Sequence, residues 1–225
     1  MSPDPDALSE TMEDYLGAIH RFTARPRGAS TTRLAEHLGV KPASVTGMLK
    51  RLAELGLISY RRYHHIALTQ EGERRAHDLI KRHRLAERLL TDVLKLPLDQ
   101  AHAEACKLEH AVSPALVPRL ALALGSPRSC PHGHPVDAAA PDNTIALTDA
   151  PIGSTLAIAR LEDETAEVVR YLADRSLLPG ARVTLQETEP LGGAVAIEAG
   201  GKKHTLGYRI ASSIRVGKPK RRRAR

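Results

Sequence analysis

Residues 31–69 read TTRLAEHLGVKPASVTGMLKRLAELGLISYRRYHHIALT, and this stretch decides the fold of the N-terminal region. Its first part has the periodicity of a short amphipathic helix, with Thr31 or Thr32 as the N-cap and Gly39 as the stop. After a tight turn, Pro42 stands near the start of a second amphipathic helix, where its fixed φ angle is favourable. The pattern predicts a helix-turn-helix.

The sequence on either side completes a winged helix. Upstream, residues 10–24 place apolar side chains along one stripe at helical spacing. Downstream, two short β-prone runs at residues 57–60 and 66–69 flank the basic segment RRYHH. We therefore predict a winged helix-turn-helix domain over residues 1–76.

A helix-turn-helix with a basic wing is typical of proteins that read duplex DNA, because the second helix fits the major groove and the wing straddles phosphates. Polar and basic groups in the second helix can reach base edges, and the arginines of the wing suit phosphates. The alternative is that amphipathic helices are common and that the charged turn is only solvated. The candidate DNA-binding residues are Thr31, Lys41, Pro42, Ala43, Ser44, Thr46, Lys50, Arg51, Arg61 and Arg62.

The rest of the chain divides into a helical part and a β-rich part. Helical patterns cover about 71–94, 98–112 and 116–124, and a segment rich in Pro and Gly follows them. From residue 145, short apolar runs alternate with Gly-containing turns and predict a small β-barrel with one helical piece at 164–174. The fold class is α+β, mainly α. The expected domains are 1–76, 77–144 and 145–217, with a basic tail at 218–225.

Charge and composition narrow the classes of protein. The formal net charge is +7, but the last eight residues hold six basic groups and no acid. Such a tail can hold polyanions loosely through counterion release, or can simply be a disordered solubilising end. The apolar runs fall far short of the roughly 18–20 residues of a membrane span. There is no secretory signal, and two cysteines make no disulfide framework, so we expect a cytoplasmic protein with no membrane partner.

The strongest chemical signal is a set of donors near position 106. Cys106, Glu109 and His110 are three and four residues apart on the predicted helix 98–112, so a thiolate, a carboxylate and an imidazole share one face. His102 lies one turn before Cys106. Cysteine, glutamate and histidine together are typical ligands of transition metals, which predicts a metal site.

Two further groups of donors flank this set. His83 and Glu87 form an i,i+4 pair on the preceding helix, although such a pair is ordinarily a surface feature and a lone cysteine is ordinarily core. Cys130, His132 and His134 lie in the run CPHGHP. Because its Pro and Gly suit a turn, we interpret this run as a loop and do not count it as a metal site.

These residues carry a resemblance. The stretches KRHRLAERLLTDVLKL and HAEACKLEHAVS, downstream of ETMEDYLGAI and KPASVTGM, resemble the diphtheria-toxin-repressor family of iron- or manganese-dependent transcriptional regulators. The likeness runs from about residue 11 to residue 136, and the remainder is similar to the family's C-terminal SH3-like (FeoA-type) domain. The resemblance implies a homodimer, not an enzyme, that binds a palindromic operator when metal-loaded and represses metal-uptake genes.

The resemblance also implies two metal sites per protomer. The primary site takes Asp14 from the N-terminal helix together with Cys106, Glu109 and His110. Asp14 matches the manganese branch of the family, but Gly17 stands where that branch has a carboxylate. The ancillary site takes His83, Glu87 and His102, with Glu164 and Glu167 of the C-terminal domain as candidates to complete it.

This mixed ligand set is compatible with either Mn²⁺ or Fe²⁺ as the bound metal. Asp14 and Glu109 are hard oxygen donors that suit Mn²⁺, whereas the Cys106 thiolate favours Fe²⁺. Cys106 could instead contribute only its backbone carbonyl, which would relax that preference. We favour Mn²⁺ over Fe²⁺.

Two other function classes stay open at this point. In a winged-helix regulator that responds to a small organic ligand, the polar cluster would have only a structural role. A metalloenzyme would use the same donors, but the sequence has no HExxH motif and no Gly-rich phosphate loop.

Overall fold

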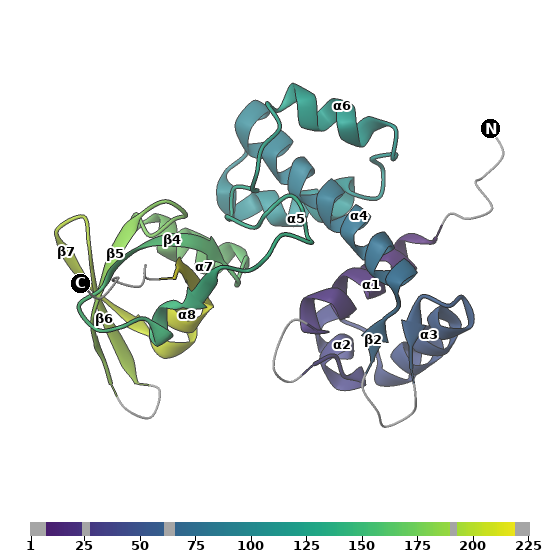
Figure 1. Cartoon of the computed structure of the whole chain (residues 1–225), viewed down its shortest axis with the longest axis horizontal. Coiled ribbons are helices and arrows are strands. Elements are labelled where there is room, and N and C mark those ends of the chain that lie inside the picture. Colours follow the sequence, from purple (N-terminus) through teal and green to yellow (C-terminus); the bar gives the residue numbers. More distant parts are fainter. Residues whose placement is uncertain (1–7, 24–27, 61–65, 190–192, 219–225) are drawn as a thin grey trace, which may run out of the picture. The chain divides into compact units, whose positions relative to one another are not determined.

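The structure is a computed structural model that describes residues 8–23, 28–60, 66–189 and 193–218 (Figure 1). The chain forms two compact units, residues 1–82 and residues 83–225. The long helix α4 supplies residues to both units. In the part of the chain that the structure describes, no helix is long and apolar enough to cross a membrane.

The first unit is the predicted winged helix-turn-helix. Its core is a single cluster of apolar side chains, in which Leu16, Leu34 and Leu49 are fully buried. Each such leucine contributes roughly 1.5–3 kcal/mol through burial, so the three helices hold one another in place. The two wing strands are antiparallel, with Ile58 opposite Leu68. The elements are α1 (Glu10–Thr23), α2 (Thr31–Leu38), α3 (Pro42–Glu54), β1 (Ile58–Ser59), β2 (Ala67–Leu68) and the first part of α4 (Gln70–Arg88).

The N-cap of α2 differs from the expectation. Ser30, not Thr31 or Thr32, caps the helix, because Ser30 has the extended backbone that a cap requires and its Oγ accepts a hydrogen bond from Arg33 N at 3.3 Å. At the other end, Gly39 has φ +65°, as expected for a left-handed stop.

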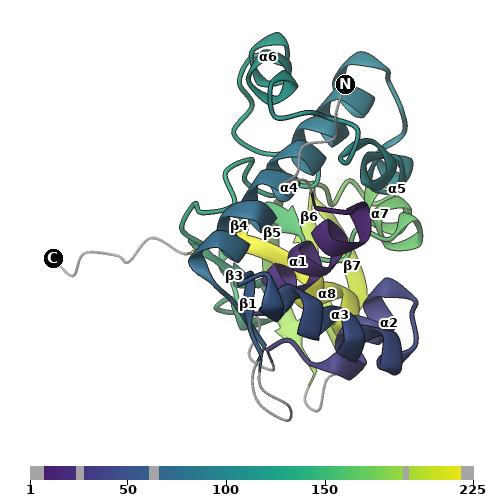
Figure 2. The ribbon, with the colours of Figure 1, turned by 90° about the vertical axis from the view of Figure 1, so that its right-hand side faces the viewer.

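The helical part of the second unit consists of the end of α4, a π-helical segment η1 (Leu89–Val93), α5 (Leu98–Leu108) and α6 (Leu116–Ala123). The helix expected over 98–112 ends at Leu108, but Glu109 keeps helical dihedral angles and its N–H donates to Ala105 O at 2.9 Å. Within this unit, α6 lies away from the sheet (Figures 1 and 2). It buries no residue, and its Leu122 is 76% exposed.

The β-rich part of the second unit is one antiparallel sheet with strand order β3-β8-β4-β5-β6-β7. The small barrel expected from the sequence is not closed: in the described residues β3 pairs only with β8 and β7 only with β6, so the sheet has two free edges. The elements are β3 (Thr144–Ala146), the 3-10 turn η2 (Leu147–Asp149), β4 (Thr155–Leu161), α7 (Ala166–Ala173), β5 (Arg182–Thr188), β6 (Ala194–Ala199), β7 (Lys202–Gly207), α8 (Tyr208–Ser213) and β8 (Ile214–Gly217).

Candidate metal centre

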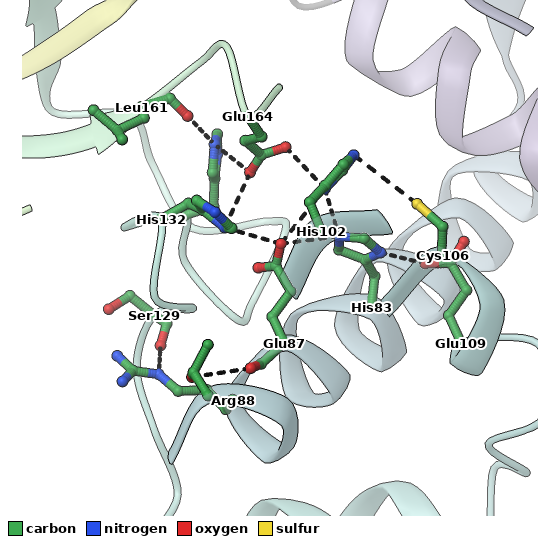
Figure 3. A network of polar contacts seen from close by, with 12 residues as sticks. His83, Glu87, Arg88, His102, Cys106, Glu109, Ser129, His132, Leu161 and Glu164 are labelled. Atoms are coloured by element: carbon green, nitrogen blue, oxygen red, sulfur yellow. Dashed lines mark hydrogen bonds and ion pairs between the residues drawn. The ribbon is translucent and has the colours of Figure 1, made fainter. Parts of the chain in front are cut away.

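Glu87 of α4 is the centre of a buried polar cluster in the second unit (Figure 3). Its Oε1 lies 3.0 Å from His132 Nδ1, 3.3 Å from His83 Nε2 and 3.5 Å from His102 Nδ1. Burial alone would raise the pKa of this carboxyl, but hydrogen bonds from the three histidines hold the pKa of Glu87 well below its ordinary value. The carboxylate is therefore ionised although it has no contact with solvent.

Four buried residues of this cluster form the first group of donors, the buried set: Glu87, Cys130, His132 and Glu164. One ligand atom from each lies within 4.8 Å of the others. Two atoms of the set, Glu87 Oε2 and His132 Nε2, are buried and have no hydrogen-bond partner. An unsatisfied buried polar atom costs about 1–3 kcal/mol, so the set fits a bound cation better than a closed hydrogen-bond network.

The buried set depends on a loop that packs against β4. Leu161 N donates to His132 O at 3.0 Å, which fixes the loop to the end of that strand. Gly133 has φ +91°, and a Cβ there would meet Ala159 O at 2.0 Å. Only glycine can make this close approach. It brings Cys130 and His132 beside Glu164, which follows β4.

The structure extends the sequence interpretation of this segment. The run CPHGHP is a loop, as expected, and Cys130 and His132 are among the four buried donors, so we add them to the candidate ligands. The Cys-x-His spacing was the available signal. Burial, with the Glu87 and Glu164 carboxylates nearby, raises the pKa of the Cys130 thiol well above its ordinary value.

A second group of donors, the exposed set, consists of His83, His102 and Cys106, again with ligand atoms within 4.8 Å of one another. Cys106 is exposed, and its Sγ lies 3.9 Å from His102 Nε2. Partial burial opposes ionisation of the thiol, but hydrogen bonds from the two histidines lower the pKa of Cys106 to about 7. Although burial acts against the charged imidazole, hydrogen bonds to Cys106 and Glu87 raise the pKa of His102 to about 9.

The remaining predicted ligands lie in three places. Glu109 Oε2 is 2.5 Å from His83 Nδ1, and Glu109 Oε1 is 3.6 Å from His110 Nε2. Asp14 belongs to α1 of the first unit, so the primary site that joins it to the second unit stays a prediction. Glu167 is exposed in the first turn of α7 and belongs to none of the candidate metal groups found in the described residues.

Gly17 of α1, where the resemblance led us to look for a carboxylate, faces a packed neighbour in the first unit. A Cβ at this position would lie 3.3 Å from Leu79 Cδ2. This distance is tighter than ordinary contact, so a longer side chain would have to displace Leu79.

The predicted DNA-reading side chains lie mainly on the exposed face of α3. Lys41, Lys50 and Arg51 are exposed, whereas Val45 and Leu49 are buried in the core. This division leaves one face of the helix free for a partner. Pro42, Ala43 and Ser44 are also exposed, Thr31 and Thr46 are half-buried, and Arg61 and Arg62 lie outside the described residues.

Three family models match successive parts of the chain. They are the iron dependent repressor N-terminal DNA binding domain over residues 7–66, the iron dependent repressor metal binding and dimerisation domain over residues 69–137, and the FeoA domain over residues 145–218. The iron-dependent repressor IdeR of Mycobacterium leprae is 33% identical over 228 residues, which cover 94% of this chain and 98% of that protein. The chain belongs to the iron-dependent repressor family.

Solved structures of related repressors agree with this assignment. A manganese-dependent transcriptional repressor in complex with manganese matches with a TM-score of 0.84 at 31% identity, covering 92% of this chain and 99% of that one. The structure of ScaR with bound Cd²⁺ matches with a TM-score of 0.82 at 27% identity and the same coverage. The predicted family, the winged helix-turn-helix with its helical and FeoA-type parts, and the function as a metal-dependent transcriptional regulator are confirmed.

Proposed function

We propose that this repressor is activated by Mn²⁺, with Fe²⁺ as the second candidate, and that the loaded homodimer binds a palindromic operator and represses metal-uptake genes. The observation that carries the proposal is the buried set, in which Glu87 Oε2 and His132 Nε2 are buried without a hydrogen-bond partner. Its two carboxylates, Glu87 and Glu164, are oxygen donors that suit Mn²⁺. Because its partner is DNA, we infer that the protein acts in the cytoplasm.

We propose two metal sites per protomer. We assign the ancillary ion to Glu87, Cys130, His132 and Glu164, with His83 and His102 bonded to Glu87 around it. Glu167 drops out of this set because it is exposed. The primary ion is assigned to Asp14, Cys106, Glu109 and His110, the set that the family resemblance implies.

The division of the primary ligands between the units suggests how metal controls DNA binding. Asp14 belongs to the DNA-reading unit, and Cys106, Glu109 and His110 belong to the other unit. A divalent cation supplies the positive charge that draws these donors together. Recognition helices of a dimer must match half-sites about 34–36 Å apart, so Asp14 would restrain the reading unit to the orientation that fits. To shift the equilibrium between other orientations and the DNA-binding orientation from 1:99 to 99:1, the ion must bind the second state about 5.5 kcal/mol more tightly.

Exposed apolar side chains support the homodimer. Val93 and Leu94 are 56% and 63% exposed, and Leu116 and Leu122 of α6 are 50% and 76% exposed. All four lie in the region that matches the metal binding and dimerisation domain. Burying them against a second copy would remove apolar surface from water.

The test is a gel shift on DNA upstream of the protein's own or neighbouring genes. We expect binding with Mn²⁺ or Fe²⁺, its loss in EDTA, and recovery when metal is added back. A Lys50→Ala/Arg51→Ala double variant is the DNA-side control, because both side chains are exposed and its fold should be unchanged. Operator binding that is indifferent to chelator would favour a regulator of organic-ligand type. Metal-dependent hydrolysis without DNA binding would favour an enzyme.

A second experiment addresses metal choice. Replacing Asp14 by Met removes a hard oxygen donor, so the metal response in operator titrations should move toward Fe²⁺ and Ni²⁺. Unchanged selectivity would remove the reason for assigning this role to Asp14. By reciprocity, operator DNA should also tighten metal binding.

A further inference from the structure

Gly47 lies near the middle of α3, the second helix of the helix-turn-helix, and is exposed. Its backbone is helical and does not have a positive φ angle, so its conformation does not require glycine. A Cβ at this position would meet nothing within 4 Å among the described residues, so packing does not require glycine either. Neither the backbone nor the packing of the described protein therefore explains why this position has no side chain.

Glycine is unfavourable for the helix in which it lies. In a helix interior, glycine is less favourable than alanine by about 4–5-fold in the equilibrium constant. The helix is held in place by Val45, Leu49 and Leu52, which are fully buried on the side away from Gly47. Because no contact of the described residues compensates for the glycine, its absent side chain is best explained by the partner of the exposed face.

The residues around Gly47 give this face a low centre. Ala43 and Ser44 lie one turn before Gly47, and Lys50 and Arg51 lie one turn after it; all four are exposed. Ala43 and Ser44 are small, whereas the two cations are long. At Gly47 the helix presents only backbone and Cα atoms, so a partner surface can approach the helix axis more closely here than beside the cations.

The partner of this face is duplex DNA. Residues 7–66 match the DNA binding domain of the iron dependent repressors. The second helix of a helix-turn-helix lies in the major groove, with its N-terminal residues at the base edges. Gly47 lies within the first two turns of α3, which is the part that faces those edges. The thymine C5-methyl group projects into the major groove and makes apolar contacts with small side chains.

We propose that Gly47 is the point at which α3 comes closest to the operator, and that a thymine C5-methyl group occupies the volume that a side chain would fill. This inference rests on the proposed function, because it concerns the operator that the repressor reads. The Gly47 Cα and the Ala43 methyl give the thymine methyl an apolar surface, and Lys50 and Arg51 are placed to contact phosphates. Gly47 thus specifies an A·T pair in each half-site without offering a side chain.

The experiment exchanges one methyl group between the protein and the DNA. Gly47→Ala adds a methyl group to the helix, and uracil in place of thymine removes one from the base while keeping the pair with adenine. Each thymine of the operator half-site is replaced by uracil in turn, in both half-sites, and affinity is measured by fluorescence anisotropy. At one position we expect uracil to weaken binding of the unaltered protein by about 4-fold per half-site, the value of one buried methyl group.

Gly47→Ala should reverse the preference at that position. Its new methyl group overlaps the thymine methyl, so we expect binding to the thymine operator to weaken by about 10-fold or more. On the uracil operator, the variant should bind about as well as the unaltered protein binds the thymine operator. In urea, its unfolding equilibrium constant should be about 4–5-fold lower, because alanine favours the helix. Lys50→Ala is the control in the same helix: it should weaken binding to both operators equally and keep the preference for thymine.

Three results would overturn the proposal. They are a preference of Gly47→Ala for thymine at every position, binding of the unaltered protein that is indifferent to every uracil substitution, and a Gly47→Ala variant that is less stable in urea. All titrations use the condition in which the unaltered protein binds its operator most tightly, whichever ion is present. A failure of metal activation therefore leaves this test intact, and the failure of one proposal is distinguishable from the failure of the other.

Discussion

The two groups of donors in the second unit differ in how the fold assembles them. The exposed set comes from two helices adjacent in the sequence, and its His102 and Cys106 are one turn apart on α5. The buried set comes from α4, from the loop before β3 and from the segment after β4, and its Glu87 and His132 are 45 residues apart. Helical spacing is enough to bring the first pair of side chains together, whereas the second group exists only when the loop is packed against the strand.

Glu87 provides the sharpest test of this comparison, because its carboxylate touches both sets. We expect Glu87→Gln to weaken metal binding at the buried set by about 100-fold or more, since a ligand charge is lost. It should also destabilise the metal-free protein by about 3–5 kcal/mol, because the charge partner of the buried histidines is removed. Co²⁺ titration and urea unfolding measure the two effects.

Glu104→Gln is the matched control for this variant. Its partner is Lys107, at 2.7 Å on the surface of α5, so we expect both quantities to stay within error. Equal behaviour of the two variants would contradict the central position given to Glu87.

Gly133 tests whether the packed loop is what assembles the buried set. In Gly133→Ala, the new Cβ would meet Ala159 O at 2.0 Å, so we expect the loop to shift and the Cys130–Co²⁺ absorption to be lost. Gly153→Ala is the control: its φ is +78° and its Cβ would meet nothing within 4 Å. Both variants carry the cost of about 1–2 kcal/mol for alanine in a left-handed conformation, but only Gly133→Ala should lose metal. Similar metal binding in the two variants would show that the close approach is dispensable.

Sequence reasoning succeeded where contacts are local. The period of α3 and the glycine stop of α2 predict the winged helix, and the i,i+4 spacing predicts that His102 and Cys106 share a face. It did not find Cys130 and His132 as candidate ligands, because their burial depends on the contact of Gly133 with β4, which no local pattern encodes.

The position of Glu167 and the open edges of the sheet also depend on features that local sequence patterns do not encode. Because α7 begins only at Ala166, Glu164 and Glu167 do not share a helix face as their spacing suggests. The expected barrel does not close because closure depends on whether the two edge strands β3 and β7 meet, and strand patterns alone say nothing about that.

The exposed set should respond to pH in the range set by its own groups. In the metal-free protein the pKa of His102 is about 9 and that of Cys106 is about 7, and both groups must lose a proton to bind metal. Metal affinity at this set should therefore rise as pH increases from 6 to 8, with proton release on binding. Co²⁺ titrations of Cys130→Ser at pH 6, 7 and 8 measure the slope. A flat profile would contradict these protonation states.

The smallest expected effect concerns the contact between α5 and α7. Arg170 Nη2 lies 2.5 Å from Asp99 Oδ2, but the Arg170 side chain is 65% exposed. We expect Arg170→Ala to change the free energy of unfolding by less than about 1 kcal/mol and to leave metal binding intact. Arg160→Ala, which removes bonds to both Asp142 and Glu162 from a side chain that is 14% exposed, should cost more in the same urea experiment. An equal or larger loss in Arg170→Ala would mean that this surface pair helps to hold the ligands.

The distance along the chain between Glu87 and His132 has a consequence for the stability of the protein against degradation. An ion held by both residues would act as a removable staple across a loop of 45 residues. Such an ion stabilises the folded chain by its binding free energy, about 2.7 kcal/mol when the free ion is at 100 times its dissociation constant. Without metal, the protein would be less stable as well as unable to bind its operator. We therefore expect proteases to degrade the ion-free form faster. The ion would thus set how long the repressor lasts in addition to when it acts.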